Sequence, residues 1–229
     1  MKFTFILVEP AVPENVGATA RAIKTMGFRN LALINPCEYL SGPARWLAHA
    51  SEEILENALI FPTLHEAVQE FDFIIGTSAK RRSVKHDYLS LSKLPELLES
   101  KGNTVRRAAI VFGREESGLR NEELKLCDLV TAVPMKTVFP SLNLAQAVML
   151  YAWELSKIAE NNFSQKSLRS EESFHSLVQK VRSILTETGF DGQSAIFSRF
   201  LERIAFLDEG DIRLFHSFCN KFLENKNNR

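Results

Sequence analysis

The sequence predicts an α/β fold with a mainly parallel sheet, followed by a small helical region. Short apolar segments alternate with amphipathic segments along the first two thirds of the chain, which is the pattern of strands joined by helices. The last third shows the spacing of amphipathic helices. A chain of 229 residues, 45% of them hydrophobic and 24% charged, is long and apolar enough to bury such a core.

The first strand and the first helix show clear signals. Residues 2–8 are mostly apolar, aromatic or β-branched, and Glu9-Pro10 closes this segment. Residues 15–26 predict a helix, because apolar side chains recur on one face and Gly27 can end it. By the same criteria we expect further strands at 31–35, 58–61, 72–76, 108–112 and 130–133, and further helices at 45–55, 64–71, 94–100 and 144–158.

A polar segment divides the chain. We expect residues 1–158 to form the α/β domain, residues 159–172 a linker, and residues 173–229 a helical extension. Within the extension, amphipathic spacing predicts helices at 174–188, 194–207 and 211–224. Five phenylalanines recur there at helical spacing, which favours packing over a platform for nucleobases: Phe197, Phe200, Phe215, Phe218 and Phe222.

Charge and composition limit the classes of function. The chain has 28 Lys and Arg against 28 Asp and Glu, so a nucleic acid would have to be bound by a local basic patch. No apolar run approaches the roughly 20 residues of a membrane-spanning helix, and the N-terminal segment lacks a signal-peptide cleavage site. Three widely spaced cysteines favour a cytoplasmic location over secretion. The His and Cys residues never reach metal-ligand spacing, so we expect neither a membrane nor a metal partner.

Several familiar catalytic motifs are incomplete. The segment 113–118 has the two-glycine spacing of a P-loop, but Leu119-Arg120 follows where Lys-Ser/Thr is required. Ser117 is not in a nucleophile elbow, because Glu115 occupies the position of the first glycine. The chain also lacks the Gly-x-Gly-x-x-Gly fingerprint of dinucleotide sites. The sequence therefore argues against nucleotide hydrolysis, a serine hydrolase and a Rossmann-type cofactor.

Three segments remain, and each has a simple alternative explanation. Residues 13–21 end in Arg21 on a helix of small residues that allow close backbone approach, although Arg21 could be an ordinary surface residue. Residues 110–119 form a strand and a glycine turn, which could be a plain strand-to-loop corner. Ligands of parallel sheets bind beyond the carboxyl ends of the strands, where the unusual segments lie. The segment 133–144 contains two polar side chains that could simply cap the next helix, Ser141 and Asn143.

In order and spacing, the three segments together resemble the signature motifs of the SpoU–TrmH branch of the SPOUT RNA 2′-O-ribose methyltransferases. The resemblance is closest to the TrmJ-like tRNA enzymes. It covers about residues 3–158 strongly and the helical extension weakly. The segments similar to motifs 1, 2 and 3 are Asn15-Val16-Gly17 through Arg21, Phe112-Gly113-Arg114-Glu115 with Gly118-Leu119, and Pro134-Met135 with Ser141-Leu142-Asn143-Leu144.

The resemblance implies a fold and a cofactor. Members of this family thread a loop in the C-terminal part of the α/β domain into a trefoil knot, so we expect a SPOUT-type sheet with such a knot here. They bind S-adenosylmethionine in the knot, mainly through backbone groups. The matching cofactor positions are Thr77, Ser78, Ala79, Gly113, Val133, Pro140, Ser141 and Leu142.

The resemblance also implies catalytic residues and an assembly. It assigns Arg21 to the ribose 2′-hydroxyl, supported by Asn15, Glu115, Ser141 and Asn143. Because the pKa of arginine exceeds about 12, we expect Arg21 to clamp the target phosphate and to stabilise alkoxide charge rather than to act as a base. Glu115 is expected to orient a neighbouring arginine or loop amides. Family members are homodimers in which this arginine reaches the cofactor pocket of the partner.

A run of basic residues follows the expected cofactor loop: Lys80, Arg81, Arg82 and Lys85. We expect it to contact RNA phosphates, although a solvated charge run is the simpler alternative.

The leading interpretation is thus a tRNA 2′-O-methyltransferase that acts in the anticodon loop. A ribosomal RNA 2′-O-methyltransferase and a non-catalytic RNA-binding protein that retains the knot remain as alternatives.

Overall fold

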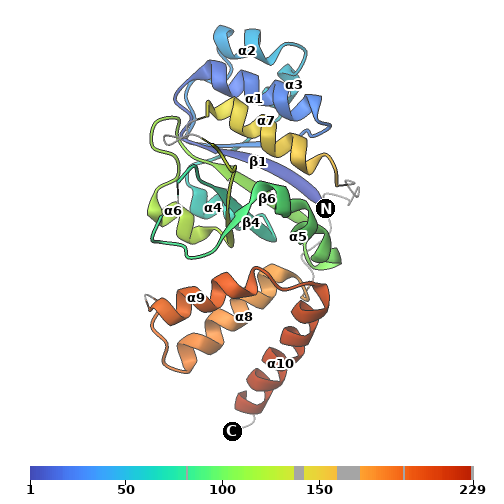
Figure 1. The fold of residues 1–229 in the computed structure, drawn as a ribbon, viewed down its shortest axis with the longest axis vertical. Coiled ribbons are helices and arrows are strands. Elements are labelled where there is room, and N and C mark those ends of the chain that lie inside the picture. Colours follow the sequence, from blue (N-terminus) through green and yellow to red (C-terminus); the bar gives the residue numbers. More distant parts are fainter. Residues whose placement is uncertain (81, 137–141, 159–170, 193, 228–229) are drawn as a thin grey trace.

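Seven strands in the described part of the chain form one parallel sheet (Figure 1). The computed structural model describes residues 1–80, 82–136, 142–158, 171–192 and 194–227. The strand order is β3-β2-β1-β6-β4-β7-β5, and every neighbouring pair is parallel, which confirms the expected α/β class. The strands are β1 (Lys2–Val8), β2 (Leu31–Ile34), β3 (Leu59–Phe61), β4 (Phe73–Thr77), β5 (Tyr88–Ser90), β6 (Arg107–Phe112) and β7 (Leu129–Ala132).

Helices cover both faces of this sheet (Figure 1). Side chains alternate along a strand, so β1 places Phe3, Phe5 and Leu7 in one apolar core and Ile6 and Val8 in the other. Both faces of the strand are therefore buried, as its continuous apolar run predicts. The first core is covered by α1 (Pro13–Thr25), α2 (Gly42–Ala48), α3 (Glu52–Glu56), α5 (Leu94–Ser100) and α7 (Leu144–Leu155), and the second by α4 (Leu64–Val68) and α6 (Asn121–Leu126).

The expected single helix at 45–55 is wrong, because the chain forms two helices there, α2 and α3. His49 and Ala50 lie between them with φ angles of 33° and 62°, in the left-handed region that interrupts a right-handed helix. The sequence analysis also missed β5 and α6. β5 has 3 residues, and Leu124 is the only buried residue of α6, so neither element carries a long apolar pattern.

The expected trefoil knot stays a prediction. It depends on the chain between β7 and α7, and residues 137–141 of that connection lie outside the described residues. On the other side of the gap, α7 begins at Leu144 and contacts both α1 and α5. This packing fixes where α7 lies on the sheet.

The helical extension contains α8 (Phe174–Glu187), α9 (Ala195–Ile204) and α10 (Glu209–Asn227). Phe174 is fully buried and meets Phe73 of β4 edge to face, with ring centroids 4.9 Å apart. The expected boundaries of the linker stay a prediction, because 159–170 lie outside the described residues. The packing favoured for the five spaced phenylalanines holds only for some of them. Phe197 is buried, but the exposed fractions are 42%, 63% and 36% for Phe200, Phe218 and Phe222.

A buried lysine joins the extension to the α/β domain. Lys101 is 0% exposed, and its ammonium group donates hydrogen bonds to the carbonyls of Ala205 (2.7 Å) and Leu207, just beyond the end of α9. The same group lies 5.3 Å from the ring centre of Phe73 and 5.2 Å from that of Phe174. Burial lowers the pKa of Lys101 to about 8, against the attraction of Asp128 and Asp208.

We expect this lysine to make stability depend on alkaline pH. Its pKa is about 8 in the folded protein and 10.5 when exposed, so between these values the unfolded chain binds a proton that the folded chain lacks. The free energy of unfolding should therefore rise by up to about 3 kcal/mol through this window. Urea denaturation from pH 7 to 10.5 should show that Lys101→Met loses this rise. The exposed Lys93 gives the control Lys93→Met, and equal pH slopes for both variants would contradict the prediction.

None of the helices in the described ranges is long and apolar enough to cross a membrane.

Candidate active site

A cavity of about 550 Å³ opens at the carboxyl ends of β4, β6 and β7. Its lining comes from the loops that follow these strands and from the first turns of α7. Two of the expected cofactor residues, Pro140 and Ser141, lie outside the described residues. The other six all line the cavity: Thr77, Ser78, Ala79, Gly113, Val133 and Leu142.

The cavity fits a nucleoside-sized ligand. Phe112, Met135 and Leu144 are apolar residues of its lining, and most of the other lining residues belong to the loops after the strands. Its volume lies within the roughly 300–1,000 Å³ of small-molecule sites. Gly113 is required by the backbone, because a Cβ there would lie 2.0 Å from the carbonyl carbon of Gly118. The residues present therefore fit S-adenosylmethionine, with Gly113 allowing the loop to close tightly.

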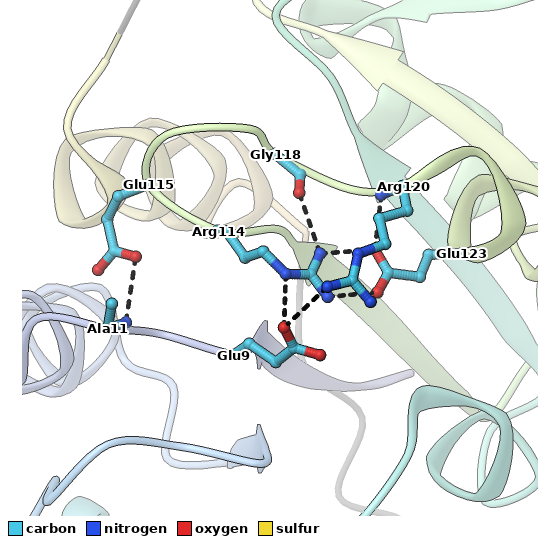
Figure 2. Close-up of polar contacts among 7 residues, drawn as sticks. All are labelled: Glu9, Ala11, Arg114, Glu115, Gly118, Arg120 and Glu123. Atoms are coloured by element: carbon cyan, nitrogen blue, oxygen red, sulfur yellow. Dashed lines mark hydrogen bonds and ion pairs between the residues drawn. The ribbon is translucent and has the colours of Figure 1, made fainter.

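Glu115 holds the beginning of α1. Its carboxylate accepts hydrogen bonds from the amides of Ala11 (3.2 Å) and Val12 (3.3 Å), and from the Asn15 side chain (3.0 Å; Figure 2 shows the Ala11 contact). Burial raises the pKa of Glu115, but these hydrogen bonds outweigh burial and hold its pKa below the usual value. Val12 makes no side-chain capping bond, and Glu115 adds negative charge at this helix terminus beside that of Glu14 in the first turn. The ionised carboxylate of Glu115 therefore positions the beginning of α1.

The side chain of Asn15 connects all three motif segments. Its amide group donates to Glu115 of the second segment, and its oxygen accepts from Asn143 of the third segment at 2.7 Å. Asn143 also caps α7, because its oxygen accepts from the amide of Ala145 at 2.9 Å. Asn15 lies in the first turn of α1, because that helix begins at Pro13.

Arg114 belongs to the second motif segment, but the sequence analysis assigned it no role. Its guanidinium forms a two-pronged ion pair with Glu123 (2.8 and 3.0 Å), bonds Glu9 at 2.7 Å and donates to the Gly118 carbonyl at 3.3 Å (Figure 2). The hydrogen bonds to Glu123 and Glu9 raise its pKa further above the usual value. Arg120 also reaches Glu9, at 3.4 Å. The carboxylates of Glu9 and Glu123 thus hold the loop of residues 113–118, which borders the cavity.

We expect Arg114→Lys to lower the free energy of unfolding by about 1–3 kcal/mol, because a lysine cannot replace the planar fork that joins two carboxylates. Arg120→Lys is the matched control, since Arg120 shares Glu9 but its side chain is 60% exposed against 13% for Arg114. Urea denaturation of both variants measures the difference. Equal losses for the two variants would show that the fork adds nothing to stability.

Arg21 does not reach this cavity within its own chain. It is exposed on α1 and is absent from the cavity lining. In the described part of the chain, no hydrogen-bond acceptor or carboxylate pairs with its guanidinium. The structure therefore leaves the Arg21 guanidinium available to a group from outside the chain.

The basic run is partly used inside the chain. Lys85 donates to the Cys127 carbonyl at 2.8 Å, and Arg82 donates to the Ser117 carbonyl at 2.9 Å. Lys80 is exposed at the cavity, and Arg81 lies outside the described residues. RNA contact by these four residues stays a prediction. Among the described members, Lys80 is the one whose side-chain cation makes no hydrogen bond to another described residue.

Within the described ranges, no group of three or more His, Cys, Asp or Glu side chains could hold a metal ion. The site has a pocket for an adenosine-like molecule and a hydrogen-bonded rim, and helix α1, which is bonded to that rim through Asn15, carries Arg21. These features suit a group transfer in which positioning and charge stabilisation matter more than an acid–base pair.

A family model described as "SpoU rRNA Methylase family" matches residues 2–153. The chain belongs to the SpoU rRNA methylase family. A second model, "tRNA/rRNA methyltransferase LasT, C-terminal domain", matches residues 171–226 of this SpoU methylase.

Two relatives and one solved structure extend this SpoU assignment. The chain is 37% identical to "Uncharacterized tRNA/rRNA methyltransferase LasT" of Escherichia coli strain K12, over 98% of this chain and 99% of that protein. It is 35% identical to "tRNA (cytidine-2'-O-)-methyltransferase TrmJ" of Methanocaldococcus jannaschii, over 79% of this chain and 80% of that one. The crystal structure of TrmJ from Z. mobilis ZM4 superposes with a TM-score of 0.68 at 24% identity, covering 97% and 99% of the two chains, which shows the shared fold.

Proposed function

We propose that this SpoU-family protein transfers a methyl group from S-adenosylmethionine to a ribose 2′-hydroxyl in the anticodon loop of tRNA, in the cytoplasm. The observation that carries the proposal is the chain of hydrogen bonds from Asn143 through Asn15 to Glu115, which joins all three motif segments at one cavity. The TrmJ relative, which methylates the 2′-oxygen of tRNA cytidine by its name, supports tRNA as the substrate.

In this mechanism the chain's own residues bind and orient. Bound S-adenosylmethionine supplies a methyl group on a sulfonium, open to in-line attack. The backbone at Thr77, Gly113 and Leu142 would hold the cofactor, and Arg114 and Glu115 keep the surrounding loops rigid. Arg21 would clamp the phosphate next to the target ribose and stabilise the developing alkoxide. Such near-attack positioning can supply roughly 7–11 kcal/mol of barrier reduction.

The proposal includes a homodimer with composite sites and the knot of the family. Arg21 does not line the cavity of its own chain, so a partner must supply the arginine if Arg21 is catalytic. Apolar side chains are available for such contact: on α7, Leu150 is 37% exposed and Trp153 is 57% exposed. Exposed apolar side chains that lie close together, with an aromatic residue among them, are typical of subunit contacts.

Cofactor binding and RNA methylation test the function directly. In the presence of a chelator, calorimetry should show one S-adenosylmethionine site per protomer, because the proposed mechanism uses no metal. Ribose-methylation mapping of RNA from cells lacking the gene should show one tRNA nucleotide that loses its methyl group. Loss at a ribosomal RNA nucleotide instead would favour the other substrate in the family's description. Cofactor binding without any methylated RNA would contradict the proposed enzyme and favour a non-catalytic RNA-binding protein.

A further inference from the structure

Helix α9 of the extension holds a segment that borders the active-site cavity. We define residues 82–87 as the rim segment, because Arg82 lines the cavity at one end. At the other end, the Asp87 carboxylate accepts from Arg199 at 2.8 Å and from Arg203 at 3.4 Å. Burial raises the pKa of Asp87, but the bonds from the two arginines outweigh it and lower the pKa. The contact is therefore an ion pair at neutral pH.

Glu202 adds a second contact between the same elements. It is 3% exposed, and its carboxylate accepts from the backbone amide of His86 at 3.2 Å and from Arg199 at 3.3 Å. Arg199, Glu202 and Arg203 are spaced i, i+3 and i+4, so they lie on one face of α9. A buried carboxylate is costly unless it is bonded, so this face is built to hold the rim segment.

Hydrogen bonds connect the rim segment with the end of α6 and with the loop that contains Ser117. Lys85 bonds the Cys127 carbonyl at 2.8 Å, and the amide of Arg82 donates to the Tyr88 hydroxyl at 2.8 Å. The Arg82 guanidinium then donates to the carbonyl of Ser117 at 2.9 Å. Ser117 belongs to the loop that carries Glu115. A series of contacts therefore connects the helical extension with the cofactor cavity and with the loop of Glu115, which is expected to support catalysis.

We propose that Arg199, Glu202 and Arg203 are positioning residues for the methyl transfer, which hold the rim segment in the shape that cofactor binding requires. None of the three lines the cavity, so they act through Asp87 and His86. The groove of about 850 Å³ beside α9 does not form a separate site for RNA phosphates, because Asp87 and Glu202 balance its two arginines. The inference rests on the proposed function.

Arg199→Ala tests the inference in the full chain. We expect the Kd for S-adenosylmethionine, measured by calorimetry without RNA, to rise about tenfold, and the KM for the cofactor to rise more than the KM for tRNA. Hydrogen exchange should speed up in peptides covering 82–88. Arg213→Ala is the matched control, because Arg213 forms a comparable exposed ion pair with Glu209 at 2.8 Å on α10.

Two further variants separate positioning from general damage to the fold. Arg199→Lys keeps a cation for Asp87 and Glu202, which Arg199 bonds through the single nitrogen Nη1, and should recover most of the cofactor affinity that Arg199→Ala loses. Glu202→Gln keeps an acceptor for the His86 amide and should have a smaller effect than Arg199→Ala. Unchanged hydrogen exchange at 82–88 in folded Arg199→Ala, or an unchanged Kd, would overturn the inference. A wild-type protein that binds no cofactor would instead overturn the proposed function, while the exchange measurement still decides the role of α9.

Discussion

Arg21→Ala should lower methyl transfer by at least about 10²-fold while the Kd for S-adenosylmethionine stays unchanged. The expected loss is that of other residues that stabilise charge in a transition state. Cofactor affinity should persist, because Arg21 does not line the cavity of its own chain and its guanidinium bonds no acceptor in the described ranges. Single-turnover methylation of tRNA and calorimetry with the cofactor measure the two quantities.

Two further variants on α1 test whether the effect is specific to the guanidinium group of Arg21. Lys24→Ala removes another exposed cation from α1, one that pairs with Glu53 at 2.6 Å, and should keep near-normal turnover. Arg21→Lys keeps the charge but not the planar fork, so it should recover part of the rate at most. A clear fall in cofactor affinity for Arg21→Ala would show that Arg21 supports the pocket and does not meet the substrate.

Much of the fold could be predicted because its strands are simple apolar runs. β1 is buried on both faces, and its run of apolar residues indicates this without any knowledge of its neighbours. The break between α2 and α3 could not be predicted, because His49 and Ala50 adopt positive φ without a glycine to signal it. The exposed Phe218 shows the same limit in the extension, since helical spacing alone does not say which face is covered.

The Arg114 cluster shows why part of the site was missed. Glu9 and Arg114 are 105 residues apart, so no local pattern joins them. The structure pairs Leu7 of β1 with Phe112 of β6, and two residues further along each strand bring Glu9 opposite Arg114. The strand order together with the register of β1 and β6 would have placed these two residues side by side. The internal contacts of the basic run could not be predicted either, because the acceptor of Lys85 is a backbone carbonyl that a sequence does not reveal.

Mixing two inactive variants should restore activity if the active sites are composite. Asn143→Ala removes the cap of α7 and the partner of Asn15, so the motif segments of its own chain should no longer be held together. Loss of the cap costs about 1 kcal/mol, and the variant should therefore remain folded. In a heterodimer with Arg21→Ala, one site then combines an intact Asn143 with an intact Arg21 from the partner. The second site of the same dimer lacks both.

Random exchange of subunits makes half of the dimers mixed, so activity should return to about one quarter of the wild-type value. Methylation of tRNA after co-refolding the two variants measures this, and native mass spectrometry counts the heterodimers. A double variant carrying both changes on one chain, mixed with wild type, gives the comparison, because its heterodimers should hold no site that is intact in both residues. If confirmed heterodimers of the two single variants stay inactive, Arg21 serves its own subunit. The packing of α1 against α7 would then have to change for Arg21 to reach the cavity.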